Sequence, residues 1–218
     1  MSQFLVAIDG PAGSGKSSVS KQVARELGFG YLDTGAAYRA LAWAIAEGHV
    51  ARPAADAETF SGFDYSISLN PDDFWVKSYG VDITEAIRLP KIAESVSAVA
   101  SVPAVRRFMK ELTRGLVAQS ELAGVVVEGR DITTVVAPDA PVRLLLTASE
   151  EIRLERRAKE LSPEDLATLR KQVLERDKSD SKVVDFMKPA EGVDLVDTTN
   201  LDFEQSVQAV LSIIREQL

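Results

Sequence analysis

The chain contains no cysteine and a single histidine, His49. The lack of cysteine excludes disulfide bonds, thiolate metal sites and cysteine nucleophiles, and one histidine excludes a multi-histidine metal site within the chain. Magnesium bound by oxygen ligands remains open. No apolar run approaches the roughly 20 residues that span a bilayer, and the opening sequence "MSQFLVAIDG" lacks the basic region of a signal peptide. We therefore expect a cytoplasmic protein.

Positive charge is also scarce, with 25 lysines and arginines against 33 aspartates and glutamates, a net charge of -8. Nucleic acids and anionic membranes favour basic surfaces, so we expect neither as a partner. We expect small-molecule partners and a monomer. Any anionic ligand must be bound by arginines and lysines that gather locally.

Short apolar segments alternate along the chain with longer amphipathic ones, which predicts an α/β fold built on a parallel sheet. The predicted strands are Phe4–Ile8, Gly30–Leu32, Val125–Val127, Val142–Leu146 and Leu195–Val196. The predicted helices are Lys16–Leu27, Thr34–Glu47, Pro103–Gln119, Glu150–Glu160 and Phe203–Glu216. We expect Gly28 to end the first helix and Asp202 to begin the last one.

Two segments depart from this alternation. Residues 52–100 include a stretch of alternating apolar and polar residues around Asn70-Pro71-Asp72-Asp73. This pattern predicts an antiparallel hairpin within an insertion. The segment Leu161–Val184 is highly charged and has few large apolar residues, so we predict a mobile lid there.

A glycine-rich motif follows the first predicted strand and precedes the first predicted helix. Its residues are Gly10, Pro11, Ala12, Gly13, Ser14, Gly15, Lys16 and Ser17, which fit G-x-x-x-x-G-K-[S/T]. In such a loop the backbone N–H groups and the positive end of the following helix bind phosphates. We expect this motif, with Ser18, to bind a nucleoside triphosphate. Lys16 would bridge the β- and γ-phosphates, and the Ser17 hydroxyl would bind magnesium.

The rest of the sequence indicates what happens to the triphosphate. A GTPase would need N-K-x-D, but the two asparagines, Asn70 and Asn200, precede proline and leucine. The strand in "AGVVVEGRDI" leads to Glu128, which could orient magnesium-bound water, and Arg130 follows it. An arginine there suits a phosphate acceptor better than a catalytic water. We predict phosphoryl transfer to a second anion.

Arginine suits this chemistry because its planar guanidinium forms two hydrogen bonds to a phosphate and keeps its charge. At Arg130, next to a glycine at a strand end, a functional role is favoured over a structural one. For the three arginines of the Glu150–Glu160 helix, an exposed helix face is equally consistent with the spacing. The candidates are Arg39, Arg106, Arg130, Arg153, Arg156, Arg157 and Arg176.

The motifs "IDGPAGSGKSS", "YLDTGAAYRA", "GRDITTVVAPDA", "ERDKSDS" and "VDTTNLDFEQ", in this order, resemble those of bacterial cytidylate kinases. The resemblance spans nearly the whole chain and includes the hairpin-bearing insertion between the second and third motifs. It implies a nucleoside monophosphate kinase fold, a P-loop NTPase core with a five-stranded parallel sheet, a small mixed insertion domain and a helical lid. The single domain 1–218 would comprise a core (1–33, 104–152 and 185–218), a monophosphate-binding insertion (34–103) and the lid (153–184).

The resemblance also implies the reaction, in which ATP and CMP or dCMP give ADP and CDP or dCDP with magnesium. Lys16, Arg39, Arg130 and Arg176 would be catalytic. By matching position, Arg39 and Arg130 would bind the acceptor phosphate, and Thr34, Arg106 and Asp131 would face cytosine. Asp180, with Arg176 nearby, would bind the ribose hydroxyls, and Arg157 would lie over the ATP.

The assignment of Asp131 is chemically sensible, because a carboxylate accepts a hydrogen bond from the exocyclic amine of cytosine. Three positions differ from the common family pattern. Glu128 stands where aspartate is common, Thr133 replaces a frequent glycine, and Val183 replaces a usual arginine. Two alternatives stay open: a kinase of another small acceptor, such as UMP, AMP or shikimate, and a nucleotide-binding regulator without turnover.

Overall fold

The structure is a computed structural model that describes residues 3–51, 60, 62–160 and 186–218. The predicted lid, with Arg176, Asp180 and Val183, lies outside the described residues. The chain divides into two compact units. One unit comprises Met1–Tyr31 and Leu122–Leu218, and the other comprises Leu32–Glu121.

The first unit is built on a five-stranded sheet in the order β2-β6-β1-β7-β8. β1 pairs in parallel with both β6 and β7, and β7 pairs in parallel with β8. The strands span Phe4–Asp9 (β1), Gly30–Asp33 (β2), Gly124–Gly129 (β6), Val142–Thr147 (β7) and Asp194–Asp197 (β8). Each of the five predicted strands is confirmed, with ends extended by one or two residues.

Strand register determines which residues meet at the edge where the parallel strands end. Asp9, the last residue of β1, pairs with Gly129, the last residue of β6. The loop that follows β1 and the turn that follows β6 therefore start side by side. This register places the glycine-rich loop and the turn with Arg130 at one edge of the sheet. Open α/β sheets bind ligands at that edge, the carboxyl ends of their parallel strands.

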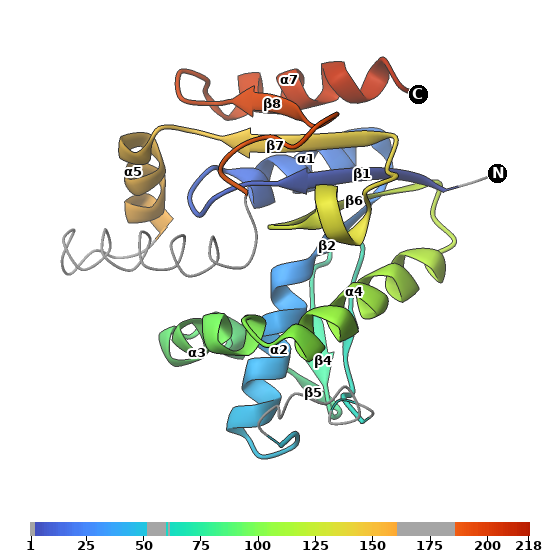
Figure 1. The fold of residues 1–218 in the computed structure, drawn as a ribbon, viewed down its shortest axis with the longest axis vertical. Coiled ribbons are helices and arrows are strands. Elements are labelled where there is room, and N and C mark those ends of the chain that lie inside the picture. Colours follow the sequence, from blue (N-terminus) through green and yellow to red (C-terminus); the bar gives the residue numbers. More distant parts are fainter. Residues whose placement is uncertain (1–2, 52–59, 61, 161–185) are drawn as a thin grey trace. The chain divides into compact units, whose positions relative to one another are not determined.

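Helices cover the sheet because its central strands are apolar on both faces. Val6, Ala7 and Ile8 of β1 are fully buried, as expected for a parallel sheet. Helix α1 (Lys16–Leu27) packs on β6 and on α7 (Phe203–Arg215). Helix α5 (Glu150–Glu160) follows β7 and lies on the side to which the β1 and β7 arrowheads point (Figure 1).

The predicted ends of two helices are confirmed by their capping geometry. Gly28 after α1 is left-handed, with φ 65°. Asp202 accepts a hydrogen bond from the Gln205 backbone N–H, and the Gln205 side chain accepts one from the Asp202 backbone, which completes a capping box at the start of α7.

The second unit combines helices with a three-stranded antiparallel sheet in the order β3-β4-β5. The predicted hairpin is confirmed, because the Asn70–Asp73 turn joins β3 and β4. Helix α4, which the sequence prediction grouped with the core, belongs to this unit. The elements are α2 (Thr34–Ala46), β3 (Ser66–Ile67), β4 (Val76–Ser78), β5 (Val81–Asp82), α3 (Pro90–Ala100) and α4 (Pro103–Ala118).

Helix α3 was missed by the sequence prediction. Its core side chains, Ile92, Val96 and Val99, are separated by four and three residues, and Pro90 occupies its first turn. Both features are typical of a helix. They were overlooked because the whole segment 52–100 was assigned to an insertion with a small sheet.

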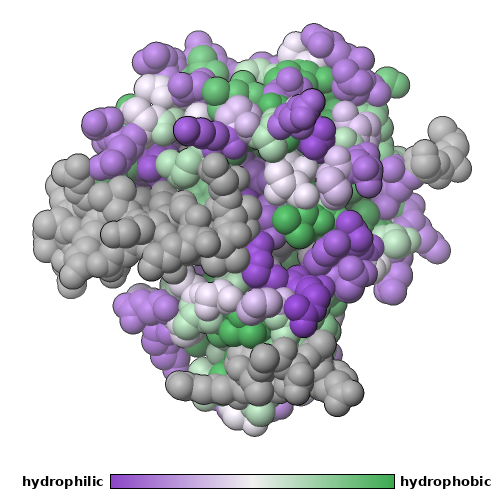
Figure 2. Space-filling model, in the orientation of Figure 1, coloured by the Kyte–Doolittle hydropathy of each residue, from purple (hydrophilic) through white to green (hydrophobic). Residues whose placement is uncertain are grey.

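The exposed large apolar side chains of the described residues lie on several different elements. On the face shown in Figure 2, hydrophobic residues form separate patches among hydrophilic ones. Among the described residues, no helix has the length and apolar character needed to cross a membrane.

The capping box of α7 gives a test of local stability. We expect Asp202→Ala to lower the free energy of unfolding by about 1 kcal/mol, because the side chain satisfies a backbone N–H of the first turn. Asp202→Asn is the matched control, since asparagine caps as well as aspartate, and it should leave stability nearly unchanged. Urea unfolding curves measure both variants. Equal losses for alanine and asparagine would show that the cap is unimportant.

Candidate functional site

The phosphate loop has the backbone conformation that its glycines were expected to allow. Gly13 and Gly15 have φ values of 76° and 87°, a region that other residues rarely adopt. A Cβ on Gly13 would lie 2.4 Å from the backbone oxygen of Arg153. Glycine is thus required at position 13 for two reasons, its φ angle and its close approach to α5.

Two arginines of α5 hold the carbonyl groups of this loop. Arg153 Nη1 donates to the Ala12 oxygen at 2.9 Å, and Arg156 Nη1 donates to the Ser14 oxygen at 3.1 Å. A trans peptide group directs its C=O and N–H in opposite directions. The N–H groups of Gly13 and Gly15 therefore point away from α5, which leaves them oriented as anion-binding donors.

These contacts bear on whether the α5 arginines form an exposed helix face. Arg153 is buried, with 4% of its surface exposed. Arg156 also donates to the Thr198 hydroxyl and to the Thr198 and Leu201 carbonyls. Both arginines support the loop, and the burial of Arg153 shows that the exposed-face alternative is wrong for that residue. The role of Arg157 stays a prediction.

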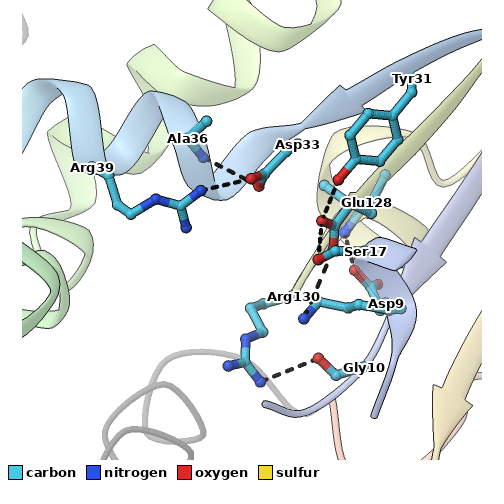
Figure 3. Close-up of polar contacts among 11 residues, drawn as sticks. Asp9, Gly10, Ser17, Tyr31, Asp33, Ala36, Arg39, Glu128 and Arg130 are labelled. Carbon is cyan, nitrogen blue, oxygen red and sulfur yellow. Dashed lines mark hydrogen bonds and ion pairs between the residues drawn. The ribbon is translucent and has the colours of Figure 1, made fainter. Parts of the chain in front are cut away.

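Glu128, near the end of β6, contacts polar side chains from the end of the phosphate loop and from β2. Its Oε1 accepts hydrogen bonds from the Ser17 hydroxyl at 2.5 Å and from the Tyr31 hydroxyl at 3.0 Å (Figure 3). Lys16 Nζ lies 3.8 Å from Oε2. Only 2% of Glu128 is exposed, so this carboxylate is held by three partners in a nearly dry position. Tyr31 was not singled out from the sequence.

The same contacts bear on magnesium. The Ser17 hydroxyl and the Glu128 carboxylate are neighbouring oxygen donors, which suits a hard cation. No group of three histidine, cysteine, aspartate or glutamate side chains suited to a metal ion occurs in the described part of the chain. A magnesium ion here would therefore take most of its ligands from phosphate and water, as is usual for nucleotide-bound magnesium.

The turn after β6 carries Arg130 and Asp131 and is fastened to β1. Arg130 Nη1 donates to the Gly10 oxygen at 3.1 Å, and its guanidinium lies 4.5 Å from the centre of the Phe186 ring. This cation–π contact holds the guanidinium at the start of the phosphate loop. Asp131 is buried.

Asp9 fixes the backbone that follows Asp131. Its carboxylate accepts from the Ile132 and Thr133 backbone N–H groups at 2.8 and 2.9 Å, and from the Thr133 hydroxyl at 2.6 Å. Burial raises the pKa of Asp9, the hydrogen bonds from Thr133 and Ile132 act to lower it, and the Asp131 charge acts to raise it. Asp9 was not singled out from the sequence.

The second unit carries the "DTGAAYR" cluster at the junction of β2 and α2. The Asp33 carboxylate caps α2 by accepting from the Ala36 N–H at 3.2 Å, and it pairs with Arg39 Nη2 at 2.6 Å (Figure 3). Thr34 is buried, and Arg106 lies half-buried on α4. The structure thus places three predicted acceptor residues in this unit, with Arg39 held by a carboxylate from its own motif.

Comparison with known proteins gives one family for most of the chain. A sequence model described as cytidylate kinase matches residues 6–216. A cytidylate kinase from Streptomyces avermitilis is 41% identical over 223 residues, covering 98% of this chain and 93% of that protein. One from Rhodococcus opacus is 42% identical over 228 residues, covering 99% and 96%.

Solved structures agree at the level of the fold. A sugar kinase from Janibacter sp. has a TM-score of 0.51 and 14% identity, covering 98% of this chain and 95% of its own. An uncharacterised protein from Eubacterium ventriosum has a TM-score of 0.55 and 12% identity, covering 98% and 99%. At this identity the likeness concerns the fold alone.

The close approach of Gly13 to α5 gives a second test. We expect Gly13→Ala to lower the free energy of unfolding by about 2–5 kcal/mol, since it adds backbone strain and displaces the Arg153 carbonyl. Gly28→Ala is the matched control, because Gly28 has φ 65° and its added Cβ would meet nothing within 4 Å. Strain alone should cost about 1 kcal/mol there. Denaturant unfolding measures both, and equal losses would refute the role of the α5 contact.

Proposed function

Because the chain belongs to the cytidylate kinase family and is an enzyme that transfers the γ-phosphoryl group of ATP to CMP or dCMP, we propose how its residues divide this work. The observation that carries the proposal is the convergence of Lys16 and Ser17 on Glu128, beside a turn that presents Arg130. Phosphoryl transfer requires a loop that binds phosphates, oxygen ligands for magnesium and a positively charged group held in place.

The donor side is assigned to the loop and to α5. The backbone of Gly10–Ser18 binds the ATP phosphates, and Lys16 bridges the β- and γ-phosphates. The Ser17 hydroxyl, and Glu128 through water, would hold a magnesium ion. Such an ion would supply positive charge to offset that of the phosphates. Arg157, from the last turn of α5, lies over the ATP.

The acceptor side is assigned to the residues that match the family motifs. Arg39 and Arg130 bind the acceptor phosphate, and Thr34, Arg106 and Asp131 face cytosine. Asp180, with Arg176 nearby, would bind the ribose hydroxyls, and Arg176 is also assigned a catalytic role; both residues lie outside the described residues. The support for Arg130 is its fixed position above Phe186 and against Gly10.

Catalysis on this assignment consists of charge neutralisation and alignment. An oxygen of the acceptor phosphate attacks the γ-phosphorus, and the bond to the ADP oxygen breaks. Lys16, Arg39 and Arg130 balance the negative charge of the donor and acceptor phosphates. A lid that closes over both substrates would exclude the water that could otherwise accept the phosphoryl group.

The remaining predictions extend this proposal. We infer that the protein acts as a cytoplasmic monomer on small nucleotides, with no nucleic acid or membrane partner. The support is compositional: the chain is acidic, free of cysteine and, in the residues that the structure describes, without a helix that could span a membrane. The division into core, monophosphate-binding insertion and lid is part of the same proposal.

An ADP-release assay with a panel of acceptors tests the substrate assignment. With ATP and magnesium we expect CMP and dCMP to be phosphorylated with specificity constants at least about 100-fold above those of UMP and AMP, because a mismatched hydrogen-bonding edge costs several kcal/mol. Shikimate should give no turnover. Lys16→Met excludes a contaminating kinase, since its activity should fall by about 100-fold or more. A preference for any other acceptor over CMP would contradict the assignment.

Asp131 gives the sharpest test of base recognition. Asp131→Asn supplies an amide N–H that can face the uracil carbonyl, so we expect the ratio of kcat/KM for CMP to that for UMP to fall by about 10- to 100-fold. Asp139→Asn is the matched control, since Asp139 is exposed on the same segment and its variant should keep the wild-type ratio. An unchanged ratio in Asp131→Asn would show that this carboxylate does not read the base.

A further inference from the structure

Tyr65, just before β3 in the second unit, carries a buried polar atom that the assigned reaction does not use. Among the described residues, its hydroxyl oxygen is shielded from solvent and has no hydrogen-bond partner. Most buried side-chain polar atoms have a partner, and leaving one unpaired carries a cost in stability. Tyr65 belongs to the same unit as the Asp33–Arg39 pair, and a ligand bound by that pair would supply the missing partner.

The position of this hydroxyl is fixed by packing. The Tyr65 ring stacks on Phe63, with centroids 5.6 Å apart and an interplanar angle of 15°. Phe63 in turn meets the edge of Phe108 on α4, at 6.2 Å, and Phe108 also contacts Phe60 at 5.4 Å. Stacked and edge-to-face aromatic pairs hold ring orientations. Helix α4 also carries Arg106, so the same packing links Tyr65 to a helix with a proposed acceptor residue.

The surroundings of the hydroxyl keep it a hydrogen-bond donor. Burial raises the pKa of the Tyr65 hydroxyl, the Asp33 charge adds to this rise, and the Arg39 charge acts against it. Tyr65 is therefore protonated at neutral pH and lies within the electrostatic reach of the Asp33–Arg39 pair. A guanidinium has five N–H donors, so Arg39 can keep its contact with Asp33 and still bind a phosphate.

We propose that Tyr65 is an acceptor-binding residue whose hydroxyl donates a hydrogen bond to the phosphate group of the acceptor nucleotide beside Arg39. This inference rests on the proposed role of Arg39. A neutral donor beside the guanidinium adds to phosphate binding without adding another charge next to Asp33. The sequence alone offered no sign of it, because Tyr65 belongs to the alternating pattern of the hairpin.

The variant Tyr65→Phe removes only the hydroxyl, and the proposal predicts opposite effects on binding and on stability. We expect KM for CMP to rise about tenfold, the loss typical of one hydrogen bond to a charged group. KM for dCMP should rise equally, since both acceptors carry the phosphate, whereas KM for ATP should stay unchanged. The melting temperature should be unchanged or higher, because the removed hydroxyl has no partner in the part of the chain that the structure describes.

Tyr79→Phe is the matched control, because the Tyr79 hydroxyl donates to the Gly62 oxygen at 2.8 Å. It removes the same atom from the same unit, so the melting temperature should fall slightly while KM for CMP stays at the wild-type value. Steady-state kinetics and thermal unfolding of the three proteins measure these effects.

Three results would overturn the proposal. The first is an unchanged KM for CMP in Tyr65→Phe, and the second is a rise for CMP but not for dCMP, which would assign the hydroxyl to the ribose. The third is a melting temperature that falls as far as in Tyr79→Phe. Calorimetric titration with CMP alone separates this inference from the proposed function. If the wild-type protein binds CMP without phosphorylating it, the reaction assignment fails, and equal Kd values for wild type and Tyr65→Phe would refute the role of Tyr65.

Discussion

The first unit depends on one buried carboxylate, that of Glu128. It sits at the end of β6, accepts hydrogen bonds from Ser17 and Tyr31, and faces Lys16. The start of α1, the start of β2 and the edge of the sheet are thereby joined by one group. A buried carboxylate without partners would be costly, so these contacts stabilise the fold and position the groups at the end of the phosphate loop together.

Around this carboxylate, backbone groups are oriented by side chains from distant parts of the chain. Arg153 and Arg156 bind carbonyls of the phosphate loop, and Asp9 binds N–H groups of the turn that carries Arg130. The result is a set of donors and cations that are positioned before any ligand arrives. Preorganised groups of this kind are a main source of catalysis in reactions that bring negatively charged phosphates together.

The second unit follows a different design. Its "DTGAAYR" cluster is held by an internal ion pair between Asp33 and Arg39, and the Tyr65 ring is held by its stacking on Phe63. These side chains are thus kept in place by neighbours in the same unit.

The sequence by itself determined the α/β fold, all five strands of the main sheet, the phosphate loop and the hairpin, because these depend on local patterns: apolar runs, glycines at strict spacing and turn residues. It also indicated the family through short motifs. Helix α3 was within reach of the same reasoning. Only the tertiary structure decided that Arg153 and Arg156 support the loop, that Tyr31 and Asp9 hold Glu128 and the Arg130 turn, and that Tyr65 keeps an unpaired hydroxyl. The residues in these contacts are mostly distant in the sequence, and their pairing is set by strand register and side-chain packing, which no local pattern records.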